Sequence, residues 1–150
     1  MAHLSNEQPN NALLIARFIA AGFIVVVAAM TVAAFSIATG ADPTDPAAFD
    51  AAEARLVRSV MLALGAVFPF LSIVVRRIMD ARAIASGAPF QRRLQNMLIA
   101  LSLCEIPAIL GFVAAALLHD VRAVLLLGLF SVTACAMHFP RRRMFEPEHR

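Results

Sequence analysis

The amino-acid sequence predicts an all-α fold, an integral membrane four-helix bundle that forms a single transmembrane domain over residues 1–150. The chain is 61% hydrophobic with a mean hydropathy of +0.78, whereas soluble domains contain about 45–50% apolar residues. A soluble globule of this size needs more polar surface than this composition supplies. In addition, the apolar residues gather in four long segments, which cover residues 12–38, 59–75, 97–118 and 123–139.

Each of the four segments is expected to cross the membrane as a helix. About 20 residues are needed to cross the hydrocarbon, and about 17–25 are tolerated. The segments 12–38 and 97–118 meet this length comfortably, and 59–75 and 123–139 are at its short end. Backbone groups in lipid must find their hydrogen bonds within the segment, so we expect four transmembrane α-helices. The first apolar run is longer than the core of a signal peptide, so we expect it to stay uncleaved.

The connections between the segments separate the helices clearly. Residues 40–46 are rich in glycine, proline and aspartate, which is typical of a turn. Asp50 or a neighbour is expected to cap a short amphipathic lead-in, through Glu53, to the second helix. The third and fourth segments are joined only by His119–Arg122. They are therefore expected to form a tight antiparallel hairpin, in which the residues at 119 and 120 make the turn.

The distribution of arginine predicts the orientation. The connection between the second and third helices carries five arginines, the C-terminal tail carries three close to the membrane, and residues 40–54 carry none. The positive-inside rule then places this connection and both termini, with polar tails 1–11 and 141–150, in the cytoplasm. Arginines at this face are also expected to contact lipid headgroups. They are Arg76, Arg77, Arg92, Arg93, Arg141, Arg142 and Arg143.

Other features of the composition indicate the cellular location of the protein and the classes of function that are not expected. All thirteen basic residues are arginine and alanine is abundant, which indicates a GC-rich bacterial genome and hence the bacterial inner membrane. The clustered arginines do not form a nucleic-acid patch. Cys104 and Cys135 lie in apolar runs and are expected to be packing residues. His138 is expected to be a solvated interfacial histidine. No phosphate loop, nucleophile–base pair or metal-ligand set is present, so neither an enzyme, a cofactor nor a metal site is expected.

Glu105 is the most informative residue, because it stands alone near the middle of the third segment. A carboxylate within hydrocarbon is costly and is by default a functional hypothesis. The aliphatic and phenylalanine residues of that helix favour insertion by about 3–7 kcal/mol, and one ionised group opposes it by about 2.5–3.5 kcal/mol. We therefore expect the helix to insert and Glu105 to be neutral much of the time, as a proton carrier requires.

The residues around Glu105 add two features. Pro107 removes its own amide and opens the helix at the preceding turn, where Ser102 is the nearest polar side chain. Small residues also recur at intervals of three and four, and they form a groove that lets another helix approach closely. These are Ala100, Cys104, Ala108, Gly111 and Ala115. Glu105 and Ser102 are thus candidates for ion binding, while a hydrogen-bonded tie between helices, worth about 0.6 kcal/mol, remains an equal alternative.

The stretch from about residue 81 to residue 118 resembles the proteolipid (c) subunit of rotary ATP synthases. The resemblance rests on a basic loop that contains proline, followed by an apolar helix with one carboxylate and a fixed spacing of small and aliphatic residues. These residues are Ala88, Pro89, Arg92, Arg93, Glu105, Ala108, Ile109, Gly111, Phe112 and Val113. The resemblance implies a helical hairpin in which Glu105 is the ion-binding carboxylate.

Two functions follow as expectations. The first is a proton-handling, proteolipid-like membrane subunit that uses Glu105. The alternative is a non-catalytic accessory subunit that packs in a larger membrane complex through the small-residue groove. In either case the expected partners are the lipid bilayer and further copies of the chain or other membrane subunits. A small-solute carrier is a weaker interpretation, because the helices contain no obvious polar substrate site.

Overall fold

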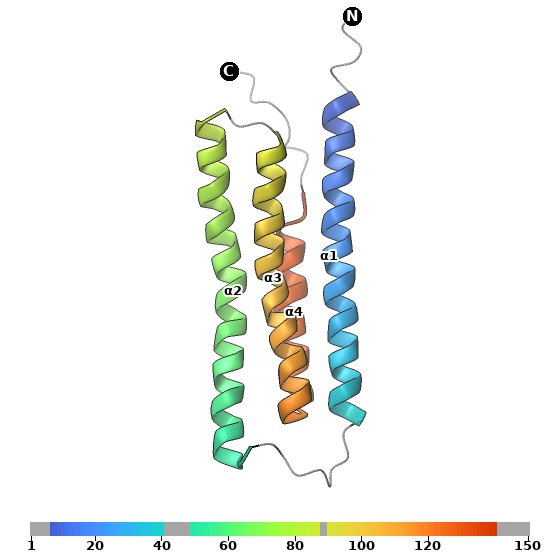
Figure 1. Ribbon diagram of the computed structural model, residues 1–150, viewed down its shortest axis with the longest axis vertical. Helices are drawn as coiled ribbons and strands as arrows, with labels where there is room; N and C mark the ends of the chain where they lie inside the picture. Colours follow the sequence, from blue (N-terminus) through green and yellow to red (C-terminus); the bar gives the residue numbers. More distant parts are fainter. Residues whose placement is uncertain (1–6, 41–48, 88–89, 141–150) are drawn as a thin grey trace, which may run out of the picture.

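The computed structural model describes residues 7–40, 49–87 and 90–140. This part of the chain forms four helices and no strand, which confirms the predicted all-α four-helix bundle (Figure 1). The helices are α1 (Glu7–Gly40), α2 (Ala51–Ala85), α3 (Phe90–Leu118) and α4 (Val121–Met137). They alternate in direction, so the start of α1, the α2–α3 connection and the end of α4 lie at the same end of the bundle.

Some predicted features lie outside the described residues. These are the turn at 41–46, Ala88 and Pro89, and the tail that contains Arg141, Arg142 and Arg143. α1 begins at Glu7, five residues before the predicted segment 12–38.

The four helices do not contribute equally to the interior. α3 packs against each of the other three helices, and α4 also contacts all of them. α1 and α2 lie on opposite sides of this central pair and scarcely touch each other (Figure 1). The α3–α4 hairpin is therefore the centre of the bundle, and α1 and α2 are its outer helices.

α2 is much longer than the predicted segment 59–75. Asp50 caps its start, since a side-chain oxygen accepts hydrogen bonds from the amides of Ala52 and Glu53, both at 2.8 Å. The Glu53 side chain in turn accepts from the Asp50 amide at 3.1 Å, which completes a capping box. The expected lead-in is thus continuous with the helix. Hydropathy identified only the apolar part of α2, because the helix continues in polar sequence on both sides.

Three described helices, α1, α2 and α3, are long and apolar enough to cross a membrane, which makes this an integral membrane protein. α4 is a shorter apolar helix of 17 residues. At 1.5 Å per residue it is only about 25 Å long, slightly less than the hydrocarbon thickness of about 30 Å. α4 also ends two residues earlier than predicted, at Met137.

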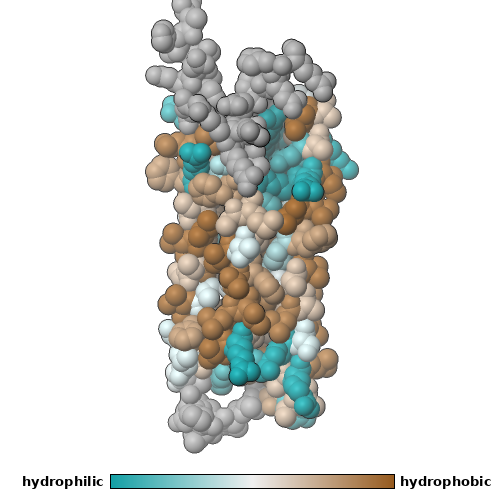
Figure 2. Space-filling view, turned by 180° about the vertical axis from the view of Figure 1, so that it is seen from behind, coloured by the Kyte–Doolittle hydropathy of each residue, from teal (hydrophilic) through white to brown (hydrophobic). Residues whose placement is uncertain are grey.

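Two polar layers mark the limits of the apolar part. Arg58 of α2 forms an ion pair with Asp120 near one end, and Arg76 of α2 is hydrogen-bonded to His138 near the other. The 18 residues from Arg58 to Arg76 correspond to about 27 Å of helix, close to the hydrocarbon thickness of about 30 Å. Figure 2 shows hydrophilic residues towards both ends and hydrophobic residues between them. The predicted segment 59–75 is the part of α2 between these layers.

The predicted small-residue groove lies in the interior of the bundle. Ala100, Cys104 and Ala115 are fully buried, and Ala108 and Gly111 are buried as well. A Cβ atom added at Gly111 would lie 3.4 Å from the Leu127 Cβ of α4 and 3.7 Å from the Val124 carbonyl oxygen. Cys104, Ala108 and Ala115 also pack in clusters with residues of α1 and α4, so the groove accommodates helices of the same chain. A partner subunit has to use another surface, which corrects this part of the accessory-subunit prediction.

Candidate functional site

The end of α4 lies inside the bundle and needs hydrogen-bond donors from another helix. α2 and α3 continue well beyond the end of α4 (Figure 1). The last carbonyl groups of a helix have no amide partner within it, and lipid supplies none. Arg76 of α2 fulfils this need, since its Nη1 donates to the His138 carbonyl oxygen at 2.8 Å. Its positive charge also complements the negative end of the α4 dipole.

The hydrogen bonds of His138 fix its tautomer. Nη1 of Arg76 lies 3.0 Å from Nδ1 of His138, and a guanidinium group can only donate, so Nδ1 accepts. In the neutral ring the hydrogen is then on Nε2, which lies 2.8 Å from Oγ of Ser72. Ser72 in turn donates to the Pro69 carbonyl oxygen at 2.6 Å. His138 is thus held as a neutral ring between a charged donor and a hydroxyl acceptor.

Further side chains extend this arrangement to α3. Asp80 pairs with Arg76, Nε to Oδ2, at 3.4 Å, and its other oxygen accepts from Nδ2 of Asn96 at 3.1 Å. The thiol of Cys104 donates to Oγ of Ser72 at 3.3 Å. We name these six residues the His138 network: Ser72, Arg76, Asp80, Asn96, Cys104 and His138. The network joins α2, α3 and the end of α4.

A second contact joins α3 and α4 beside the proline. Ser131 of α4 is fully buried, and its hydroxyl donates to the Cys104 carbonyl oxygen. Pro107 lies within α3 and has no amide for the carbonyl of Leu103, four residues before it. A side chain from another helix thus provides a hydrogen bond to the α3 backbone near Pro107. Ser72 and Ser131 therefore both make contacts between helices.

Two predictions at this end of the bundle are wrong. His138 is buried, with 3% of its surface exposed, and is not a solvated interfacial residue. Arg76 is 7% exposed and lies in the interior, so it does not face the lipid headgroups. Arg77 and Arg92 are exposed as expected, and Arg93 is half-buried. One feature of the sequence pointed to the buried pair of Arg76 and His138. The fourth apolar segment is short, so its helix has to end before the longer neighbouring helices do.

The opposite polar layer is built on the turn between α3 and α4. Asp120 caps α4, because its Oδ1 accepts from the amides of Arg122 at 3.0 Å and Ala123 at 3.3 Å. Its other oxygen pairs with Arg58 of α2. His119 adopts a left-handed conformation with φ 49°. These residues form the turn, as predicted, and Asp120 also joins the turn to α2.

Glu105 occupies a different environment. It is one residue from the midpoint of α3, the helix Phe90–Leu118, and is half-buried. Cys104 and Ala108 are buried while Ile109 is 47% exposed, so Glu105 lies at the edge of the packed face of α3. No hydrogen bond or ion pair links Glu105 to another residue that the structure describes. The predicted partner Ser102 is exposed and makes no hydrogen bond to it.

Within the described ranges, no group of three or more histidine, cysteine or acidic side chains is arranged to hold a metal ion. Cys104 and Cys135 are buried free thiols. Chemically, the bundle therefore offers one satisfied polar network and one intramembrane carboxyl group.

Comparison of the chain with models of protein families, with curated proteins and with solved structures found no match. The resemblance of residues 81–118 to proteolipid subunits therefore stays a prediction.

Proposed function

We propose that this is a small multi-pass protein of the bacterial inner membrane in which Glu105 binds and releases a proton. We further propose that its termini are cytoplasmic and that it acts as a proteolipid-like subunit in a homo-oligomer or a larger membrane complex. The observation that carries the proposal is the position of Glu105 at the middle of α3, half-buried and without a described polar partner.

The energetic argument concerns the charge of the carboxyl group. Burial of an ionised carboxylate without a partner is costly, and in lipid the group takes up a proton instead. At the edge of the packed face, a small movement or a neighbouring subunit changes the access of water to Glu105. A carboxyl group that is neutral in lipid and ionised beside water is the minimal device for carrying a proton.

The His138 network supports a subunit over a self-contained channel. Its guanidinium group, on Arg76, is buried between α2 and the end of α4 and is bonded to His138 and paired with Asp80, so these polar groups are engaged in holding the helices together. A proton therefore reaches Glu105 more easily along the outside of the bundle, where another copy or another subunit supplies the polar path.

The exposed faces of α1 and α2 offer the surface for such an association. Both outer helices carry large apolar side chains that are at least half exposed. On α1 these are Leu14, Ile15, Phe18, Val25 and Val32, and on α2 they are Leu56, Val67, Phe70 and Ile84. A non-catalytic accessory subunit, the alternative function, would use the same faces, because the small-residue groove is already filled.

Labelling with a hydrophobic carbodiimide in native membranes tests the proposal. This reagent modifies protonated carboxyl groups that are accessible from lipid, and the modified residue is mapped across a range of pH. We expect selective modification of Glu105 that decreases as the pH rises, and no modification of this peptide in Glu105→Gln. Asp80 and Asp120, which are ion-paired, serve as internal controls. An unreactive Glu105 at every pH would support the accessory-subunit alternative.

A further inference from the structure

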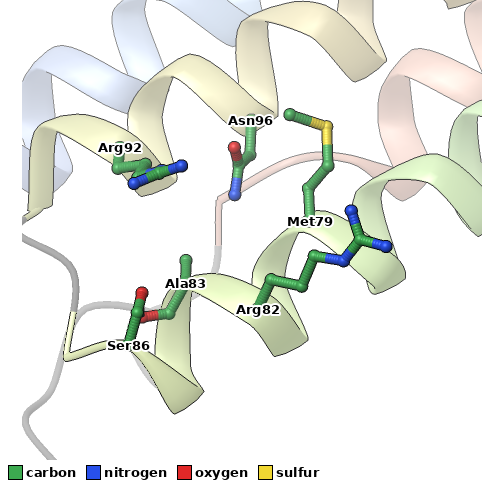
Figure 3. Close-up of a pocket in the computed structure, with 6 residues that line it drawn as sticks. All are labelled: Met79, Arg82, Ala83, Ser86, Arg92 and Asn96. Carbon is green, nitrogen blue, oxygen red and sulfur yellow. The ribbon is translucent and has the colours of Figure 1, made fainter.

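A cavity of about 300 Å³ lies between α2 and α3 at the end of the bundle that holds the His138 network. We name it the α2–α3 pocket, after the helices that line it. Its lining residues are Met79, Arg82, Ala83, Ser86, Arg92 and Asn96 (Figure 3). Pockets for small molecules measure about 300–1,000 Å³, so this volume suits a compact polar group better than a large substrate.

The polar side chains of the pocket are mainly hydrogen-bond donors. In Figure 3 the Arg92 side chain extends from α3 on the side of Ser86 and Asn96, and Arg82 extends from α2 on the side of Met79. Arg82 and Arg92 both line the cavity, one from each helix. The Ser86 hydroxyl already donates to the Ala83 carbonyl oxygen at 3.2 Å, so the two guanidinium groups are the donors that matter for a ligand.

The two arginines that line the pocket are not neutralised by an acidic residue of the described part of the chain. Neither Arg82 nor Arg92 forms an ion pair with a described acidic residue, and both are exposed. The nearby carboxylate, Asp80, is already engaged by Arg76 and Asn96. Arg82 and Arg92 thus bring two cationic side chains to the pocket. An anion is the ligand that this excess of positive charge favours.

The depth of the pocket in the membrane indicates which anion it meets. Met79 and Arg82 are three and six residues beyond Arg76 in α2, which corresponds to about 5 and 9 Å. The headgroup region extends about 5–8 Å beyond the hydrocarbon on each side. If the layer at Arg76 marks the edge of the hydrocarbon, the pocket opens at the depth of the lipid phosphates. Guanidinium groups bind phosphate with two parallel hydrogen bonds.

We propose that the α2–α3 pocket is a binding site for a phosphate group, held by Arg82 and Arg92. The phosphate belongs either to an anionic phospholipid, whose chains lie against the apolar surface of α2 and α3, or to free inorganic phosphate. The site is independent of the function proposed for Glu105.

Two ligands distinguish the sources of the phosphate. Protein in neutral detergent is titrated with phosphatidylglycerol or with inorganic phosphate, and binding is followed by native mass spectrometry and by the shift of the unfolding temperature. Phosphatidylcholine and sodium chloride at equal ionic strength are the reference additions. Stabilisation by phosphatidylglycerol alone identifies a lipid site, and stabilisation by inorganic phosphate identifies a site for the free anion.

Variants of exposed arginines test the location. We expect Arg82→Gln and Arg92→Gln each to weaken binding about tenfold, since each removes a charge-assisted hydrogen bond. Arg77→Gln is the matched control, because Arg77 is exposed on α2 at the same end and does not line the pocket. None of the three variants removes a described ion pair, so all are expected to fold. The proposal is overturned if neither ligand binds better than its reference, or if Arg77→Gln weakens binding as much as the other two.

Discussion

Arg76 and Glu105 are both ionisable residues on long apolar helices, and their surroundings differ completely. Arg76 donates to the carbonyl oxygen and to Nδ1 of His138 and pairs with Asp80. No described residue forms a hydrogen bond or an ion pair with Glu105. The charge of Arg76 is thus part of the fold, because the end of α4 depends on it, whereas no feature of the fold requires Glu105. This difference separates a structural charge from a candidate functional one.

The largest effect is expected at Arg76. Arg76→Met leaves the end of α4, the His138 ring and the Asp80 carboxylate without their donor, and loss of one partner of a buried pair costs about 3–5 kcal/mol. The free energy of unfolding in mixed micelles measures this loss. Arg77→Met is the matched control, because Arg77 is exposed, and its expected effect is within about 0.5 kcal/mol. Equal changes in the free energy of unfolding for the two variants would contradict the structural role of Arg76.

A smaller loss of stability is expected when a residue of the small-residue groove is enlarged. Gly111→Leu forces a larger side chain against Leu127 and the Val124 backbone of α4, and overpacking costs about 1–3 kcal/mol. The loss should appear in the unfolding of the isolated chain. Gly22→Leu is the control, since a side chain there meets open space. A Gly111→Leu chain that unfolds normally but no longer associates would show that the groove serves a partner after all.

The coupling between His138 and Ser72 should be modest. Hydrogen bonds between membrane helices are worth about 0.6 kcal/mol on average and about 1.7 kcal/mol at most. We expect the double-mutant cycle of His138→Ala and Ser72→Ala to give a coupling energy in this range, because the two side chains are 2.8 Å apart. A coupling energy of zero would contradict the tautomer and the hydrogen bonds assigned to His138.

The smallest effect on stability is expected at Glu105. Glu105→Gln exchanges a group without a described partner for a neutral one of the same shape, so the free energy of unfolding should change by less than about 0.6 kcal/mol. Unfolding in the same micelles as for Arg76→Met allows direct comparison. A loss of several kcal/mol would show that Glu105 is a structural tie, and the contrast with Arg76 would disappear.

The membrane class and the four helices could be predicted from sequence because both depend on local composition. The start of α2 was predicted, because Asp50 was expected to cap a lead-in through Glu53. Its C-terminal extension to Ala85 was missed, since hydropathy reports only the lipid-facing length. Arg76 and Arg77 are identical neighbours in sequence, and a rotation of about 100° on the helix decides which one is buried. That rotation, and the height at which α4 ends, are properties of the packed bundle.

The position of Glu105 was predictable because a single acid in an apolar segment is visible in any sequence. Whether Glu105 forms a hydrogen bond with Ser102 could not be predicted. A spacing of three residues makes the two side chains neighbours on the helix surface but determines neither their rotamers nor their exposure. The same limit applies to the small residues of α3. Their spacing predicted a close helix contact, and only the fold shows that α4 of the same chain provides it.

Infrared difference spectroscopy of the protein in lipid bilayers tests the central claim most directly. The carbonyl stretch of a protonated carboxyl group is recorded across pH for the wild-type chain and for Glu105→Gln. The account predicts a protonated-carboxyl band that is present at low pH, fades as the pH rises and is missing in Glu105→Gln. A Glu105 that is ionised at every pH, or that shows no change with pH, would contradict a proton-carrying role.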